Sequence, residues 1–263
     1  MMMKSMVREI NEIIKYRELL KNLVVRDIKV RYRRSVLGFV WVMLNPLLMM
    51  LILYVVFSEL FKVSTKNFTV YLLSGITLWN FFSQSTIATV GSFLGNSNLI
   101  KKIYLPKAIL PLSANLSALI NFVFSIFPLV AVLIFSSTPV SPHFYLIPFV
   151  LILLFTFSFG ISLFLSTLTV FFHDTIHIYE VVLLGWMYAT PVFYPESIIP
   201  QKFGIILKLN PLYYYMRLFR NALYMDTSSL TSDLMYGTIF STLSLILGAM
   251  FYMNNRKRII YYI

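Results

Sequence analysis

The stretch that most constrains this chain is a long apolar run that directly follows a cluster of cations. The run covers residues 36–60 and carries no charge before Glu59. A helix that spans a bilayer needs about 20 predominantly apolar residues, so this run is long enough to cross. Five cations fall within the nine residues 26–34. Because positive residues that flank a span stay on the cytoplasmic side, we expect an integral membrane protein whose first span runs from inside to outside.

The composition extends this conclusion to the whole chain. Of its 263 residues, 59% are hydrophobic, whereas soluble domains contain roughly 45–50% apolar residues. The net charge of +12 could indicate a nucleic-acid partner, but the cations lie in short clusters between apolar runs, and ten of the 22 Lys and Arg residues precede residue 35. Clusters of this kind set membrane topology. We therefore expect several spans, no large soluble domain and no nucleic-acid partner.

We predict six spans, because six apolar stretches alternate with short polar or cationic segments. Cations in the N-terminal segment, in residues 101–107 and in residues 256–258 place both termini in the cytoplasm. The predicted fold class is an all-α integral membrane protein with a cytoplasmic segment 1–35 and a transmembrane domain 36–263. The predicted spans are 36–60, 68–93, 108–135, 144–172, 178–194 and 234–253.

The segment before the first span has the pattern of an amphipathic helix lying in the cytoplasmic interface. The pattern degrades near Asp27 and Arg31, which fall on the apolar side, so we expect a bend or a partner there. A basic amphipathic helix can be held by anionic lipid or can contact a soluble partner, and the sequence leaves both open. Within residues 10–24, the apolar face gathers Ile13, Tyr16, Leu20, Leu23 and Val24.

A short cationic segment, 97–107, connects the second and third predicted spans. It contains three lysines and a proline and is too short to be a domain. Taken alone, it is typical of a connector that its cations hold on the cytoplasmic side.

Residues 195–225 are apolar in patches but do not suit an ordinary span. Prolines and a glycine interrupt the patches, and four cations fall among them. Irregular backbone at membrane depth needs protein or water around it, so we expect helical pieces that dip into the outer interface. An aromatic belt at headgroup level is the alternative.

The sequence contains no evident constellation for catalysis or metal binding. It has no cysteine and no GxxxxGK[ST] loop for ATP phosphates. Carriers coupled to protons or sodium keep ionisable groups at mid-membrane depth, but Glu59 and Glu180 lie near the ends of their predicted spans. The other acidic residues are scattered, whereas an enzyme would need them clustered. We therefore expect a passive conduit driven by a partner, with no cofactor in this chain.

Some of the aromatic residues, which make up 17% of the chain, are candidates for a translocation path. Aromatic faces stack on sugar rings, and tyrosine hydroxyls offer replaceable hydrogen bonds, although most aromatics will fill the core. Arg217 and Arg220 are candidates for phosphate contact or, equally, for anchoring at lipid headgroups. The candidate path residues are Trp41, Tyr54, Tyr188, Phe193, Tyr194, Tyr213, Tyr214 and Tyr215.

The basic segment and the start of the first span carry a family resemblance. The residues that carry it are Arg26-Asp27-Ile28-Lys29-Val30-Arg31-Tyr32, Ser35-Val36-Leu37-Gly38, Trp41 and Asn45-Pro46. Asn210-Pro211-Leu212 followed by Arg217 extends the similarity towards the C-terminus. These segments resemble the permease subunit of bacterial ABC-2-type exporters, in the branch that exports polysaccharides and polyol phosphates such as O-antigen, capsule and teichoic acid.

The resemblance implies a pair of permeases in the bacterial cytoplasmic membrane that moves an undecaprenyl-type lipid-linked polymer outward. It also implies two separate ATPase subunits, which carry ATP and Mg and dock below the permeases. Residues 97–107 would then hold a coupling helix, and residues 195–225 would form paired re-entrant helices. The implied ATPase contacts are Leu99, Ile100, Lys101, Lys102, Ile103, Tyr104, Leu105, Arg26 and Arg31.

Two other functions stay open at this point. A related permease for drugs or small lipids often has a longer external domain, and the short loops here favour the polymer branch. A membrane glycosyltransferase that acts on lipid-linked substrates would need clustered carboxylates in a loop, which the sequence lacks.

Overall fold

The computed structural model describes residues 2–60, 67–225 and 229–263, and every regular element in these ranges is a helix. The predicted all-α class is therefore confirmed. The longer helices are α1 (Met2–Lys15), α2 (Arg17–Tyr32), α3 (Trp41–Val55), α4 (Phe68–Val90), α7 (Ile109–Phe135), α8 (Ile147–Phe171), α9 (Thr175–Tyr188), α11 (Pro211–Leu223) and α12 (Leu230–Asn255). The shorter ones are η1 (Gly38–Val40), η2 (Val56–Leu60), α5 (Ser92–Gly95), α6 (Ser97–Lys102), η3 (Phe144–Leu146), η4 (Glu196–Ile198), η5 (Gln201–Phe203), α10 (Gly204–Leu209) and α13 (Ile259–Tyr262).

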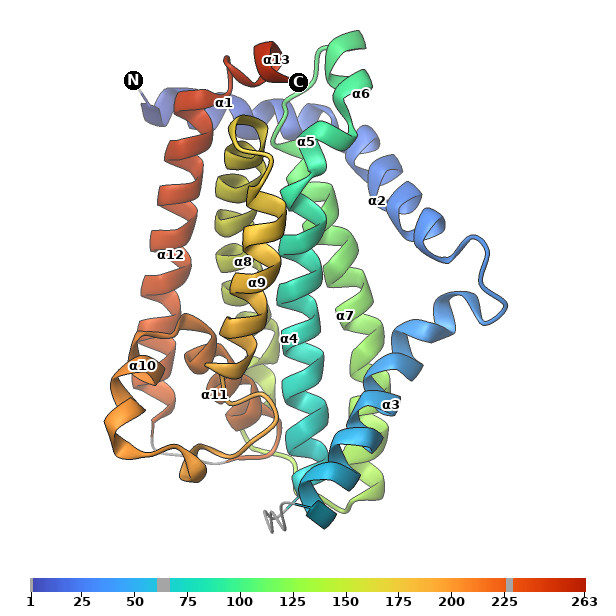
Figure 1. The fold of residues 1–263 in the computed structure, drawn as a ribbon, viewed down its shortest axis with the longest axis vertical. Helices are drawn as coiled ribbons and strands as arrows, with labels where there is room; N and C mark the ends of the chain where they lie inside the picture. The colour runs from blue at the N-terminus through green and yellow to red at the C-terminus, as the bar shows by residue number, and fades with distance from the viewer. Residues whose placement is uncertain (1, 61–66, 226–228) are drawn as a thin grey trace.

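The long helices run side by side as a bundle, with α4 at its centre between α7, α8 and α9 (Figure 1). Residues 70–79 of α4 are all buried. Three of these are small or hydroxylated, Ser74, Gly75 and Thr77, and the Ser74 hydroxyl bonds back to the Tyr71 carbonyl at 3.0 Å. Small and hydroxylated residues allow helices to approach closely. The sequence of α4 thus suits a helix surrounded by protein.

Four helical stretches are long and apolar enough to cross a membrane by length and composition: Gly38–Ser58, Ile109–Phe135, Phe144–Phe171 and Leu230–Asn255. They correspond to four of the six predicted spans. Of the other two, α4 has 23 residues but many polar ones, and α9 has only 14 residues.

The contact between α8 and α12 depends on two glycines. A Cβ atom on Gly248 would lie 2.0 Å from the carbonyl oxygen of Gly160, so a larger residue cannot enter without moving a backbone. Two serines of α12 reinforce the contact, since the Ser241 and Ser244 hydroxyls donate to the carbonyls of Leu153 and Phe157 at 2.8 and 2.9 Å. This is the small-residue packing typical of membrane helices.

The N-terminal segment crosses the end of the bundle at which both termini lie (Figure 1). Its predicted apolar face packs there, with Leu23 and Val24 buried and the rest half-buried. The helix is interrupted at Tyr16, between α1 and α2. Near Asp27 and Arg31, where we expected a bend or a partner, α2 continues and both side chains have partners.

Residues 195–225 lie at the opposite end of the bundle from the termini (Figure 1). They form η4, η5, α10 and α11, and α11 packs against α4, α8 and α12. Asn210 caps α11, because its side chain accepts from the backbone N–H of Leu212 at 3.1 Å and Pro211 occupies the first helical position.

Candidate functional site

The segment expected to contact an ATPase has one outward and one inward side. Lys101, Lys102, Ile103 and Tyr104 are exposed, and Tyr104 is 74% exposed. Ile100 and Leu105 are buried, and Leu99 is half-buried. The inward residues pack in a core at the terminal end of the bundle with Leu23, Phe93, Ile109 and Tyr252.

The helix in this segment, α6, is shorter than the resemblance implies. It ends at Lys102, and Ile103 is extended with a ψ angle of 144°. Pro106 disfavours a helical conformation at Leu105, so the chain stays irregular until α7 begins at Ile109. The exposed Lys101 and Lys102 thus lie in the last turn of α6. Buried apolar residues on either side of them, Ile100 and Leu105, hold the segment against the core.

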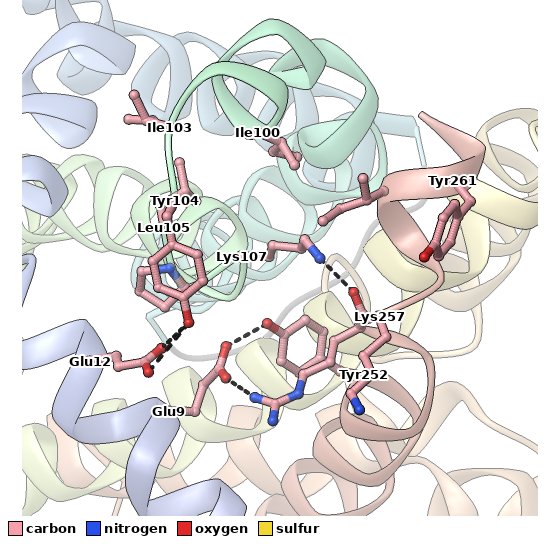
Figure 2. A pocket seen from close by; sticks show the side chains of 13 residues that line it. Glu9, Glu12, Ile100, Ile103, Tyr104, Leu105, Lys107, Tyr252, Lys257 and Tyr261 are labelled. Atoms are coloured by element: carbon pink, nitrogen blue, oxygen red, sulfur yellow. Dashed lines mark hydrogen bonds and ion pairs between the residues drawn. The ribbon is translucent and has the colours of Figure 1, made fainter.

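A network of polar side chains, here called the terminal cluster, lies directly behind this segment (Figure 2). The Tyr252 hydroxyl donates to Glu9 at 2.6 Å and accepts from the backbone N–H of Ala108 at 3.1 Å. Arg256 forms an ion pair with Glu9, and Lys107 donates to the Arg256 carbonyl at 2.6 Å. The terminal cluster, Glu9, Lys107, Tyr252 and Arg256, therefore ties together α1, the loop after α6 and the end of α12.

Burial and neighbouring charges act in different directions on the pKa of Lys107 in the terminal cluster. Burial lowers the pKa of Lys107 and the nearby Arg256 charge acts in the same direction, while Glu9 opposes both. Tyr104 reaches back to Glu12, with its hydroxyl 3.4 Å from one carboxylate oxygen. A cavity of about 500 Å³ opens between these groups and α13.

The two arginines expected at the ATPase surface have different surroundings. Arg26 pairs with Asp27 and donates to Asn96 at 3.0 Å, so it connects α2 to the residue just before α6. Arg31 donates to Gln84 of α4 at 2.9 Å.

The candidate path residues divide by exposure. Trp41 and Tyr54 on α3 and Tyr188 at the end of α9 are exposed, at 41%, 40% and 63%. Tyr194 is half-buried, whereas the other four are buried: Phe193, Tyr213, Tyr214 and Tyr215. Tyr215 is fully enclosed, and its hydroxyl bonds to Ser241 and to the Gly237 carbonyl of α12.

The two candidate phosphate contacts are both engaged within the chain. Arg217 is half-buried, pairs with Asp233 at 3.2 Å, bonds to Ser229 and donates to the Tyr213 hydroxyl at 2.7 Å. Burial, with help from Glu196, raises the pKa of Tyr213 to about 12.

Arg220 is only 2% exposed. It donates to the carbonyls of Pro191, Val192 and Tyr71 at 2.9–3.2 Å, and its guanidinium lies 3.5 Å from the centre of the Tyr71 ring. It joins α11 to α4 and to the turn after α9.

Neither Glu9 nor Tyr252 is among the site residues predicted from the sequence. They are 243 residues apart, so no local pattern connects them. A weak signal was available, because Glu9 is an acid within a basic amphipathic helix. Among the described residues, no three His, Asp or Glu side chains gather closely enough to hold a metal ion.

Comparisons with known proteins identify the family of this chain. A family model described as "ABC-2 type transporter" matches residues 18–224. The O-antigen export system permease protein RfbA of Klebsiella pneumoniae is 35% identical over 74% of this chain and 76% of its own length, and RfbA of Myxococcus xanthus is 36% identical over 79% and 80%. The polysialic acid transport protein KpsM of Escherichia coli is 24% identical over 88% and 90%. The chain therefore belongs to the ABC-2 type transporter family.

Proposed function

We propose that this chain is the membrane-spanning subunit of an ATP-driven exporter that moves a lipid-linked polysaccharide out across the cytoplasmic membrane. The observation that carries the proposal is the identity of 35–36% with O-antigen export permeases over about three quarters of both chains. A more distant relative is named for polysialic acid transport, which is also movement of a polysaccharide.

The proposed ATPase contact is the outward side of residues 99–105 together with Arg26. Exposed cations and Tyr104 suit a soluble partner with acidic and apolar groups. The Arg26–Asn96 bond connects residues 99–105 to α2, and the terminal cluster connects them to α1 and α12. In the proposal, a force that the ATPase applies to residues 99–105 is therefore transmitted to α1 and α12. Arg31, bonded to Gln84, belongs in our proposal to the membrane domain. ATP and Mg are expected on the partner.

The proposed topology has six spans and cytoplasmic termini. In this arrangement α4 and α9 join the four apolar helices, because a polar helix is tolerated when neighbouring helices surround it. Residues 195–225 would dip into the outer interface as re-entrant helices. Lys202 and Lys208, which are exposed in this region, suit headgroup level.

Two copies are proposed to form the path between them. Of the apolar stretch Gly38–Ser58, which contains α3, only about 17% is buried within the chain, and α9 exposes Ile178, Val181 and Leu184. These faces are available to a second copy or to lipid. In the proposal Trp41, Tyr54 and Tyr188 line the path, since they are exposed on the same two helices.

The experiment is co-purification with a soluble ATPase from the native membrane. The test variant is Lys101→Glu/Lys102→Glu/Tyr104→Ala, and the control is Lys202→Glu/Phe203→Ala/Lys208→Glu, which makes a similar change at the opposite end of the molecule (Figure 1). We expect the ATPase to co-purify with the wild-type chain and with the control variant, and not with the test variant. A wild-type chain that purifies without any ATPase would overturn the proposed function.

A further inference from the structure

A polar cavity lies on the side of the bundle where α2 and α3 approach α4 and α7, and residues of all four helices line it (Figure 1). Its volume is about 220 Å³. This corresponds to roughly seven water molecules at about 30 Å³ each, which is close to the space that one sugar ring with its hydroxyls fills. Four amides and three hydroxyl-bearing side chains line it: Asn45, Asn80, Gln84, Asn121, Tyr32, Thr77 and Ser125.

Two of these groups are buried with hydrogen-bonding atoms that have no partner among the described residues. Thr77 is 1% exposed and Asn121 is 5% exposed, and the Thr77 hydroxyl and the Asn121 carbonyl oxygen are both unpaired. An unsatisfied buried polar group costs about 1–3 kcal/mol. Both line the same cavity, so a ligand or water that enters it can supply the missing bonds.

Hydrogen bonds within the chain hold three of the lining side chains, Arg31, Gln84 and Ser125. Arg31 donates to Gln84 at 2.9 Å, and the Asn121 amide donates to the same oxygen at 3.4 Å. Ser125 donates to the Val42 carbonyl at 3.2 Å. Asn45 is exposed on α3, so the cavity opens at the surface of the chain.

Arg31 is the one charged group among the described lining residues, and it already donates to Gln84. The amides and hydroxyls that make up the rest of the polar lining favour a neutral ligand rich in hydroxyls. No acidic residue belongs to the part of the lining that the structure describes, so a metal or other cation has no counter-charge there. Amides can donate and accept at once, which matches the dual character of a sugar hydroxyl. Trp41, Phe81 and Phe122 add aromatic surface on which the apolar face of a pyranose can rest. Lipid tails cannot satisfy these amides.

We propose that this cavity binds a single uncharged hexopyranose unit, with Thr77, Asn121 and Asn45 bonding to its hydroxyls. The inference rests on the proposed function, because it takes the sugar to be part of the exported polymer. It assigns the sugar contact to amides between α3, α4 and α7 within one chain, separate from the aromatic residues expected along the path.

The test is saturation-transfer NMR on the full-length chain in lipid nanodiscs, purified with any ATPase that accompanies it. The probes are the methyl glycosides of glucose, mannose, galactose and N-acetylglucosamine. Thr77→Val keeps the side-chain shape and removes the unpaired hydroxyl, and Asn45→Leu removes an exposed amide at the mouth. Thr238→Val, an exposed threonine on α12, makes the same chemical change elsewhere and is the matched control.

We expect transfer to at least one glycoside in wild type and in Thr238→Val. Thr77→Val and Asn45→Leu should each weaken binding about three- to tenfold, the effect of losing one hydrogen bond. Transfer that is unchanged in both cavity variants would overturn the inference, because the sugar would then bind elsewhere. Absence of transfer in a wild-type chain that retains its ATPase would also overturn it: the cavity would hold only water, and the exporter proposal would stand. Loss of ATPase co-purification would instead contradict the proposed function.

Discussion

Replacing Arg220 with methionine should destabilise the end of the bundle formed by α11 and the turn after α9. Methionine is apolar and unbranched, so it removes the guanidinium while filling much of the same space. The Tyr71 carbonyl keeps the Ser74 hydroxyl as a donor. The Pro191 carbonyl keeps only a share of the Tyr71 hydroxyl, whose shorter bond, at 2.7 Å, goes to the Tyr194 carbonyl. Among the described residues, the Val192 carbonyl has only Arg220.

The magnitude follows from these contacts. An orphaned buried carbonyl costs about 1–3 kcal/mol, and a desolvated cation–π contact contributes about 2 kcal/mol. We therefore expect a loss of about 3 kcal/mol, since part of the sum is offset when the buried charge is removed. At about 2–4 °C per kcal/mol, Tm should fall by about 6–12 °C. The Tm of Arg220→Lys should lie between those of the wild type and Arg220→Met, because lysine retains the charge but not the planar set of donors.

The assay is thermal unfolding in detergent followed by tryptophan fluorescence, because a chain without cysteine cannot be followed with thiol-reactive dyes. Arg217→Met provides a comparison at a half-buried position three residues away. If Arg220→Met lowers Tm by less than about 2 °C, the carbonyl bonds do not stabilise this region and the structural role of Arg220 is refuted.

Three further predictions concern the helix contact and the terminal cluster. Gly248→Ala should cost about 1–3 kcal/mol by overpacking, whereas Gly185→Ala, with no atom within 4 Å of its Cβ, should be neutral; equal Tm values would contradict the close contact. Glu9→Gln should loosen α1 by removing the charge that Arg256 faces, giving roughly tenfold faster hydrogen exchange in residues 2–15, and unchanged exchange would argue against the cluster. Because burial holds the pKa of Lys107 below its ordinary value of 10.5, the folded state releases that proton more readily. Stability should therefore rise as pH increases through the lowered pKa towards 10.5, and this rise should disappear in Lys107→Met; an identical pH profile in both would contradict it.

Helix content and the four most apolar candidate spans could be predicted from the sequence, because long uncharged runs such as 36–58 and 144–172 have few alternatives in lipid. The helical face that contains Leu23 and Val24 was predicted for a similar reason, since its spacing is local. The position of the break at Tyr16 was not predicted, because the apolar pattern continues across it.

The candidate site was harder to predict because it depends on contacts between distant residues. Arg217 and Arg220 look alike in sequence, yet one is half-buried beside Asp233 and the other is enclosed by carbonyls. The bond between Glu9 and Tyr252 has no local signature. The polar cavity did leave a signal, since Asn80 and Asn121 are amides within apolar helices, where a polar side chain needs a partner.

The glycine contact between α8 and α12 also divides α12 into a short part and a long part. At about 1.5 Å per residue, Tyr252 lies about 6 Å along the axis from Gly248 and Asp233 lies about 22 Å away on the other side. If α12 tilts about that contact as a rigid rod, a displacement at Tyr252 becomes roughly four times larger at Asp233, with the opposite sign. A small pull on the terminal cluster would then move the Arg217–Asp233 pair, at the far end of the bundle, by several times as much.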